Sequence, residues 1–409
     1  MAFQTAYLKA HYPSEFFAAN LSCNLDKMDE IKKIIADCKK HHIAVLNPDV
    51  NESGLEFTAT KKGDIRFGLA GIKTFGKNVA EAIVAEREKS GVYKDLFDFV
   101  ERLAPMMNRH TLECLIYSGS FDSFGLKRTQ FESPTASGET LLDLIVKYAL
   151  GYAKDQAGDM SMSLFGDMEE LKPPRPEIPE YVPVENEVEL LHREKEFVGM
   201  YLSAHPLDRY ALEIENFTNS TIEDIPERIK ECTEKKAVAH LSLAAFSTDF
   251  TVKTSMSGKQ YSIVHIEDFT SSYEIHLMGK SHEKYLPIFN REEKNVAILI
   301  NADIDKSFRN PEEYELRIIS ISLLSNVAED MIREIKIYVD SAQVTPEFRK
   351  NLVKVLRAHK GKTPVSFAIY DKKKSYSAEV TSGKFTVEAS QLLSDELEEV
   401  GIKCSVVKK

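Results

Sequence analysis

The sequence predicts a multidomain protein with a mainly α-helical N-terminal half, then a small β-barrel, then a small α+β domain. Its 409 residues suffice for two to four domains of roughly 100–200 residues each. The apolar spacing changes from helical to alternating near Lys235, which indicates a change from helices to strands. Five of the 15 prolines fall within residues 173–183, a pattern typical of an extended linker between domains.

The composition indicates a soluble protein of the reducing cytoplasm. Hydrophobic residues make up 43% and charged residues 29%, as in ordinary globular proteins. No apolar run reaches the ~18–20 residues needed to cross a bilayer, so no membrane association is expected, and the first residues lack the pattern of a secretory signal. The five cysteines are widely spaced and form no C-x-x-C pair, which argues against a disulfide scaffold and a structural zinc site.

The charge is unevenly distributed along the chain. The net charge of −11 would argue against a nucleic-acid partner. However, residues 159–200 contain 11 acidic and 4 basic residues, whereas residues 61–128 contain 12 basic and 9 acidic residues. The negative net charge of the whole chain is therefore compatible with a mildly basic module within it.

The pattern divides the chain into successive segments. Helices are expected in residues 1–60, and short helices with glycine-containing turns in residues 61–153. An acidic, proline-rich tether (154–184) and a helical connector (185–234) follow. Alternation predicts an antiparallel β module at 235–328. Residues 329–409 fit the order strand, helix, strand, strand, helix, strand, with the helices at Thr345–His359 and Ser390–Val400.

The most informative motif is a helix-hairpin-helix pattern at residues 67–83. A short helix ending near Ile72 is expected to meet a tight turn, with a second helix starting near Lys77. Free N–H groups at a helix start can bind a phosphate, and nearby lysines add charge. The candidate duplex-DNA contacts are Lys73, Thr74, Phe75, Gly76, Lys77 and Asn78. A plain packing turn between two helices is an equal alternative.

Residues 108–122 are the candidate for a second, paired unit. Asn108 and Arg109 would be its DNA contacts. Gly119 also fits an ordinary helix end, so this segment is a weaker candidate on its own.

The tether contains an apolar cluster that suggests a short docking peptide. An apolar pair in an acidic tether is costly to expose, so it suits a partner's hydrophobic pocket. Packing against its own domain is the alternative. The cluster is Ser161, Met162, Ser163, Leu164 and Phe165.

The alternating region 235–328 fits a β-barrel of OB type. Such barrels stack bases of a single strand on aromatic side chains over a basic groove. The candidate contacts are Lys253, Lys259, Tyr261, His265 and His276, although ordinary surface or core roles are at least as compatible with the pattern. Asp303 and Asp305 have the spacing of two metal-binding carboxylates on one strand face, but acidic residues are common at strand ends. No metal site and no catalytic residue are predicted.

Four segments resemble the bacterial replicative DNA polymerase III alpha subunit. They are Phe3–Phe16, Val45–Ser53, Ile65–Leu69 and Arg193–Asp208, and they occur in the order found in that family. The resemblance is strong from residue 3 to about 210, good through the β module and weak in the tail. It identifies the sequence with the C-terminal portion of the family, from the end of the fingers region onward.

The resemblance implies a role for each segment. Residues 1–60 would end the fingers region, and residues 61–153 would form a tandem helix-hairpin-helix domain on duplex primer-template. Residues 161–165 would bind the sliding clamp (beta). Residues 235–328 would be an OB domain near the single-stranded template, and residues 329–409 would dock a clamp-loader subunit of tau type. DNA, the clamp and the clamp loader are the partners so implied.

The sequence departs from the family pattern at two motif positions. Thr74 stands where the hairpin usually has glycine, and Ser161 stands where the clamp peptide usually has glutamine. The family's palm, whose carboxylates bind two Mg²⁺ ions, has no counterpart here. Phosphoryl transfer needs that cluster, so we expect this chain to be an inactive fragment on its own, with no cofactor.

Two other classes of function remain as alternatives. A stand-alone helix-hairpin-helix and OB protein of repair or recombination would not need the clamp peptide. An accessory chain of a nuclease or ligase would use Asp303 and Asp305 with a metal.

Overall fold

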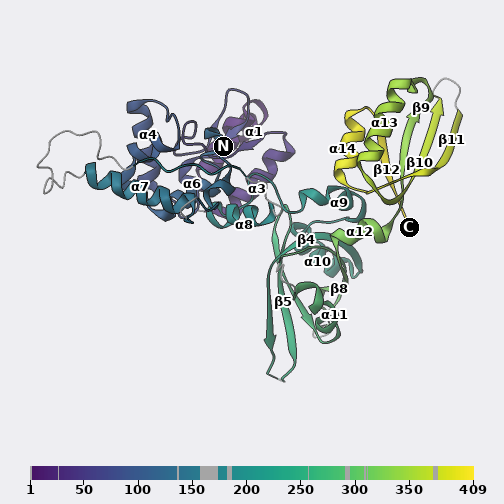
Figure 1. The fold of residues 1–409 in the computed structure, drawn as a ribbon. Coiled ribbons are helices and arrows are strands. Elements are labelled where there is room, and N and C mark those ends of the chain that lie inside the picture. Colours follow the sequence, from purple (N-terminus) through teal and green to yellow (C-terminus); the bar gives the residue numbers. More distant parts are fainter. Residues whose placement is uncertain are drawn as a thin grey trace, which may run out of the picture. The chain divides into compact units, whose positions relative to one another are not determined.

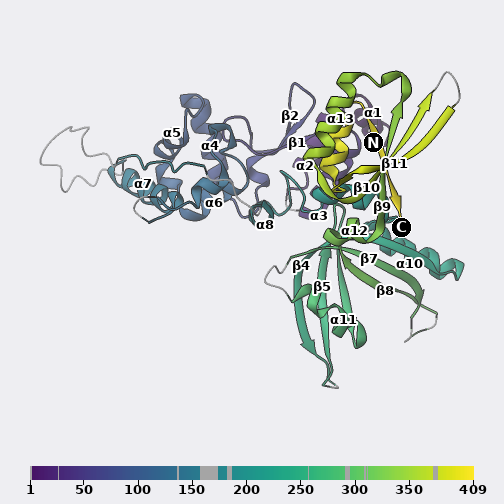
Figure 2. The ribbon, with the colours of Figure 1, turned by 45° about the vertical axis from the view of Figure 1, so that its right-hand side comes forward.

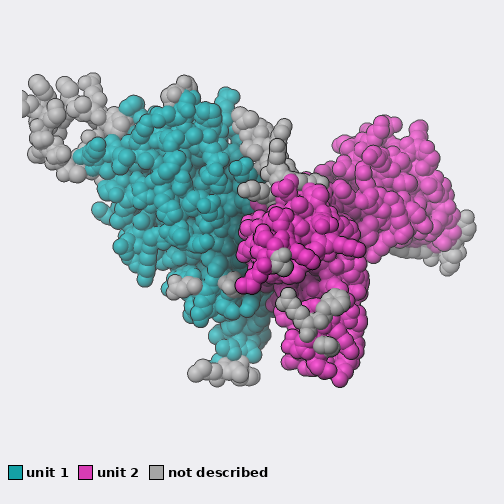
Figure 3. Space-filling view, turned by 90° about the horizontal axis from the view of Figure 1, so that it is seen from below, with its two compact units in different colours: residues 1–205 teal, residues 206–409 magenta. Residues whose placement is uncertain are grey.

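The computed structural model shows two compact units, Met1–His205 and Pro206–Lys409 (Figure 3). Each unit has its own hydrophobic core or cores, built only from its own residues. Among the described residues, no helix is both long and apolar enough to cross a membrane. The structure describes residues 2–25, 27–135, 138–156, 174–181, 187–256, 258–290, 295–307, 310, 312–371 and 376–409.

Unit 1 is mainly helical, as the sequence predicts (Figure 1). Three strands of two residues each form its small sheet in the order β1-β3-β2. The strands are β1 (Val45–Leu46), β2 (Thr58–Ala59) and β3 (Ile65–Arg66). The main helices are α1 (Ala2–His11), α2 (Pro13–Ser22), α3 (Met28–Lys40), α4 (Lys77–Ser90), α5 (Leu96–Arg102), α6 (Arg109–Tyr117), α7 (Leu141–Gln156) and α8 (Glu187–Val198).

Local signals explain where several helices of unit 1 begin and end. Pro13 occupies the first turn of α2, where a missing N–H costs nothing. Asp95 caps α5 by accepting a hydrogen bond from the Asp98 N–H. Gly91 ends α4 with a φ of 85°, a conformation that favours glycine.

Helix α8 is fastened to unit 1 by apolar and ionic contacts. Phe197 stacks on Tyr117 of α6 at 5.1 Å between ring centroids. Glu194 is fully buried and pairs with Arg128 at 2.5 Å. Its carboxylate also accepts hydrogen bonds from the backbone N–H groups of Leu202 and Ser203. The helical stretch 185–234 is therefore shared between the units, because its later helices pack in unit 2.

The β module of unit 2 is an antiparallel sheet in the order β6-β5-β4-β7-β8. The long strand β4 pairs with β7 through its first half and with β5 through its second half. A register shift between Ser247 and Asp249 separates the two halves, as a β-bulge does. The strands are β4 (Ala239–Thr254), β5 (Gln260–Glu267), β6 (Ser272–Met278), β7 (Ala297–Lys306) and β8 (Tyr314–Leu323).

The predicted β-barrel of OB type is not confirmed, because no closed barrel is found among the described residues. In the part of the chain that the structure describes, the edge strands β6 and β8 do not pair, so the sheet stays open. Helices share its core: α10 (Ile225–Lys235) contributes Ile225, and α11 (Lys280–Phe289) contributes Phe289. Closure depends on pairing between strands distant in the sequence, which alternation within each strand does not specify.

The C-terminal region of unit 2 has the predicted order of elements. Its sheet runs β11-β10-β9-β12, with β9 and β10 parallel and the other pairs antiparallel. Two helices lie on one face of this sheet (Figure 2). The strands and helices are β9 (Ile332–Asp340), α13 (Pro346–Ala358), β10 (Lys360–Asp371), β11 (Tyr376–Val387), α14 (Gln391–Glu399) and β12 (Lys403–Lys408). Helices α9 (Ala211–Phe217) and α12 (Leu324–Met331) precede them in unit 2.

Candidate nucleic-acid interface

The hairpin turn lies where the sequence places it. A short 3₁₀ helix, η1 (Leu69–Gly71), precedes the turn, and α4 begins at Lys77. Thr74 has a φ of 60°, the left-handed conformation that a β-branched residue rarely adopts. The turn therefore keeps the backbone course that a glycine would allow, although threonine occupies the position.

The start of α4 presents unpaired backbone donors to solvent. The N–H groups of Gly76, Lys77 and Asn78 have no acceptor among the residues that the structure describes. All three residues are exposed. Such donors, with the positive end of the helix dipole, form an anion-binding position.

The two lysines of the motif lie near these donors in the sequence, and both are exposed. Lys73 has no ion pair within the described ranges. Lys77 lies 3.9 Å from Glu81, and both side chains are so exposed that this contact contributes little. The pair therefore adds positive charge beside the helix start.

Phe75 occupies a different environment from its neighbours. Its side chain is only 8% exposed and belongs to the core of unit 1. Only its backbone is available to a ligand. The aromatic ring instead anchors the turn against the helices beneath it.

The start of α6 is held beside this turn. His110 Nε2 lies 3.3 Å from the Thr74 carbonyl oxygen and 3.7 Å from Cys114 Sγ. Burial raises the pKa of the Cys114 thiol to about 11, so the thiol stays protonated at neutral pH. Two helix starts, those of α4 and α6, thus lie in one region of unit 1 (Figure 1).

Asn108 and Arg109 are exposed, but both have structural partners. The Asn108 side chain caps α6 by accepting a hydrogen bond from the Thr111 N–H at 2.9 Å. Arg109 pairs with Glu113 at 3.2 Å and with Asp143 at 2.7 Å. The hydrogen bond from Thr140, with the charge of Arg109, lowers the pKa of Asp143. Arg109 is consequently less available to a phosphate than Lys73.

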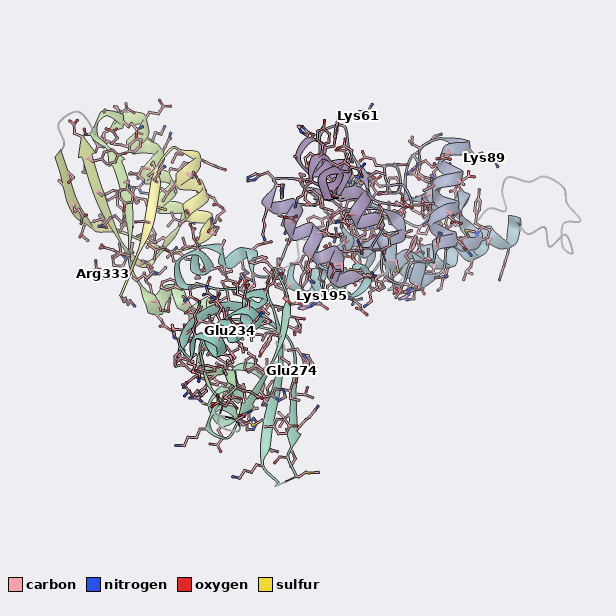
Figure 4. All side chains as sticks on the ribbon, turned by 180° about the vertical axis from the view of Figure 1, so that it is seen from behind. Lys61, Lys89, Lys195, Glu234, Glu274 and Arg333 are labelled. Atoms are coloured by element: carbon pink, nitrogen blue, oxygen red, sulfur yellow. The ribbon has the colours of Figure 1, made fainter. Side chains whose placement is uncertain are left out.

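On the β module, the structure brings three candidate residues together. Tyr261 on β5 stacks on His276 of β6, with 6.4 Å between ring centroids and 18° between the planes. Glu274 of β6 (Figure 4) lies 2.7 Å from His276 Nε2 and 3.7 Å from His265 Nε2. The two histidines and the glutamate are each nearly half exposed. This arrangement offers an aromatic surface with titratable groups around it.

The two candidate lysines of the β module lie toward the end of the β4–β5 hairpin. Lys253 is directly across from Tyr261 in the register, so the two residues share one face of the sheet. Lys259 lies in the turn just before β5 and is exposed. Both lysines thus lie at the same end of the hairpin.

The acidic pair on β7 does not resemble a metal site. Asp303 pairs with His240 at 2.8 Å, and Asp305 pairs with Arg317 at 3.0 Å. Each carboxylate therefore already has a basic partner. Within the described ranges, no group of three or more His, Cys, Asp or Glu residues is placed to hold a metal ion.

The proposed docking peptide, Ser161–Phe165, lies outside the described residues.

Sequence reasoning missed His110 and Glu274, and each had a signal in the sequence. His110 directly follows the two residues chosen from the second unit. Glu274 precedes His276 by two positions in an alternating strand, which places both on one face. Its proximity to His265 could not be read from spacing, because it depends on the β5–β6 register.

Comparison with known proteins first gives the class of the hairpin region. Residues 42–131 match the family model described as "Helix-hairpin-helix motif". This range contains the turn at Thr74, helix α4 and the start of α6. Unit 1 therefore contains a region that matches the helix-hairpin-helix motif.

Curated relatives then give the larger protein to which the chain is similar. The DNA polymerase III subunit alpha of Thermus aquaticus is 30% identical over 366 residues, which are 89% of this chain and 28% of that protein. The Vibrio cholerae subunit is 27% identical over 98% of this chain and 33% of its own length. The Neisseria meningitidis serogroup A subunit is 35% identical over 69% of this chain and 23% of its own length. The chain is a relative of the bacterial DNA polymerase III alpha subunits and fits their C-terminal portion, spanning about a quarter to a third of their length.

Proposed function

We propose that this chain holds duplex DNA through the hairpins of unit 1, as a DNA-binding part of a replicative polymerase. The observation that carries the proposal is the start of α4. Three exposed N–H groups, those of Gly76, Lys77 and Asn78, have no acceptor there among the described residues, and the exposed lysines Lys73 and Lys77 lie near them in the sequence. The similarity to polymerase alpha subunits supplies the replicative context.

The chemistry of this position fits a phosphate rather than a base. Backbone donors and lysines bind the sugar-phosphate chain without reading sequence. Gly76 has an ordinary φ of −66°, and a Cβ atom there would meet only Val79 Cγ2 at 3.5 Å. The fold therefore does not require glycine at this position, and the lack of a side chain there leaves the donors open to close approach by a ligand.

The test is the affinity of the full chain for a duplex at several salt concentrations. Changing both Lys73 and Lys77 to alanine should weaken binding equally for all sequences. It should also reduce the slope of log K against log salt by about 2. Lys89→Ala with Lys94→Ala removes one exposed cation in the last turn of α4 and one just after the helix, and serves as the matched control. Equal effects of both pairs would contradict the assignment of the turn.

For the β module, we propose contact with single-stranded template through the Tyr261–His276 face. The sheet is open and five-stranded, and α11 lies between the third and fourth of its strands in chain order, β6 and β7. This arrangement is compatible with the partly open OB type. Tyr261→Ala should weaken single-strand binding about 5- to 150-fold, since base stacking contributes about 1–3 kcal/mol. Glu274→Gln should strengthen it by removing a negative charge beside both histidines, while unchanged binding in both variants would contradict this role.

Sliding-clamp binding through Ser161–Phe165 is a proposal that rests on the sequence. Its test is calorimetric titration of the cognate clamp with the full chain and with the Leu164→Ala, Phe165→Ala variant. Binding lost in the variant distinguishes this chain from a repair protein that has no clamp peptide. Docking of a tau-type clamp-loader subunit by residues 329–409, and location in the cytoplasm, are proposed on the same basis.

A further inference from the structure

Helix α13 has a strongly basic exposed side that is separate from the proposed hairpin, Tyr261 and clamp-peptide contacts. Arg349, Lys350, Lys354 and Arg357, together called the basic strip, are all exposed. They lie at spacings that place them on one broad side of a helix. Glu347 is the single acidic residue of α13.

The four side chains of the basic strip form no ion pair within the part of the chain that the structure describes. Other cations of unit 2 do find partners: Lys336 lies 2.9 Å from Glu379, and Lys362 lies 3.0 Å from Glu329. Isolated cations such as Lys384 and Lys403 also lack an ion pair among the described residues, so the strip differs from them in grouping four such cations on one helix.

Part of the strip also faces away from the acidic helix α14. His359, just after α13, lies 3.1 Å from Glu396 of α14. Lys350 precedes His359 by nine residues, about two and a half helical turns, and so lies on the opposite side. Leu352, Val355 and Leu356 point into the core, which leaves the strip facing solvent.

The spacing of the strip matches a chain of phosphates. Arg349 and Arg357 are eight residues apart, which is about 12 Å along a helix. A nucleic-acid strand carries one charge about every 3.4 Å along a duplex axis, so several phosphates fit within this length. Like charges at i, i+4, such as Lys350 and Lys354, destabilise a helix, and an anionic ligand would relieve this repulsion.

We propose that the basic strip of α13 binds the sugar-phosphate backbone of nucleic acid, as a contact separate from the hairpins and from the Tyr261 face. A protein partner would need apolar or aromatic anchors at the centre of its interface. No exposed large hydrophobic side chain lies on α13, all of whose residues are described. The neighbouring Asn351 is exposed and adds a neutral donor of the kind that contacts phosphates.

The test uses the full chain with all four strip residues changed to glutamine. Binding of a fluorescent single-stranded 20-mer should weaken, and the salt slope should fall by about 3. The matched control changes four exposed lysines away from the strip to glutamine. These are Lys39, Lys40, Lys230 and Lys403. The strip variant must show a larger loss than this control; equal losses, or none, would overturn the proposal.

Two further measurements make the result specific. DNA should protect Lys350 and Lys354 from acetylation in the wild-type chain, and failure to protect them would refute the proposal. Poly-glutamate is the probe for an acidic protein partner: strip-dependent binding of this polymer without strip-dependent DNA binding would also overturn it. The Lys73→Ala, Lys77→Ala variant is measured in parallel, and it should retain the acetylation protection. The two variants thereby test the proposal for the basic strip and the proposal for the hairpin turn independently of each other.

Discussion

Thr74 adopts a backbone conformation that opposes the preference of its own side chain. A left-handed φ of 60° costs an L-residue about 1–2 kcal/mol, and glycine avoids this cost. Neighbouring contacts hold Thr74 in place, including the 3.3 Å contact between its carbonyl oxygen and His110. The strained residue lies directly beside the proposed phosphate position.

Thr74→Gly should therefore stabilise unit 1. The relief of strain exceeds the extra entropy of glycine in the unfolded chain, which is about 0.5–1 kcal/mol, so we expect a net gain of about 0.5–1 kcal/mol. Urea unfolding measures it. Thr74→Ala is the control, because it removes the hydroxyl and keeps the strain. A glycine variant no more stable than the alanine variant would contradict this explanation.

Two buried thiols should make the stability of unit 1 sensitive to alkali. Burial raises the pKa of Cys38 to about 12 and that of Cys114 to about 11, from an ordinary 9.0. The pKa of each thiol is higher in the folded chain than in the unfolded chain. The contribution of the protonated thiols to the free energy of unfolding is therefore complete below about pH 9 and is lost as the pH rises toward 11 and 12. The free energy of unfolding should fall across this range.

Urea unfolding at pH 8, 9.5 and 10.5 measures the effect. Changing Cys38 and Cys114 to alanine removes both titrating groups, so the variant should show a smaller fall with pH. Tyr93 and Tyr148, whose pKa values burial also raises to about 12, explain a residual fall. An identical fall in variant and wild type would exclude the thiols as the cause.

At the scale of elements, local signals in the sequence predicted where helices start and in which order the elements follow. They did not predict which strands pair with one another. The start of α4 at Lys77 and the order of elements after β9 follow from turns, caps and apolar periods. The open edge of the β module could not be predicted in this way. Strand β4 pairs with β7 before a bulge near Ser247 and with β5 after it. The alternation of apolar and polar residues along β4 does not show where its partner changes.

The cap of α6 separates a structural role from a binding role. Asn108→Ala should destabilise unit 1 by about 1 kcal/mol, because the Thr111 N–H loses its acceptor. Asn108→Asp retains the cap and adds a negative charge at the proposed DNA surface. Thermal unfolding with duplex titration should show lower stability for alanine and weaker binding for aspartate. Unchanged duplex affinity in the aspartate variant would remove Asn108 from the interface.

At the scale of the whole molecule, the separate cores predict separate unfolding. Phe99 is fully buried in unit 1, and Ile337 is fully buried in unit 2. Phe99→Ala should lower the stability of unit 1 by about 3–5 kcal/mol, and Ile337→Ala that of unit 2 by about 2–5 kcal/mol. Calorimetry should show each variant shifting a different transition. A single transition shifted by both would mean that the units unfold together.

The composition and linker predicted several domains, but not which unit each helix joins. Residues 185–234 have a uniform helical pattern, yet α8 packs in unit 1 and α10 in unit 2. The decisive contact is the burial of Glu194 against Arg128, two residues that are far apart in the sequence. Such pairings depend on tertiary packing, which periodicity does not encode.

The position of Glu194 has a mechanical consequence. The chain passes from one unit to the other once, just after His205. Glu194 holds Leu202 and Ser203 immediately before that crossing, with charge-assisted bonds that are stronger than neutral ones. A pulling force would therefore load this anchor before it reached α8, and the anchor would protect unit 1 from being peeled apart from its C-terminal end.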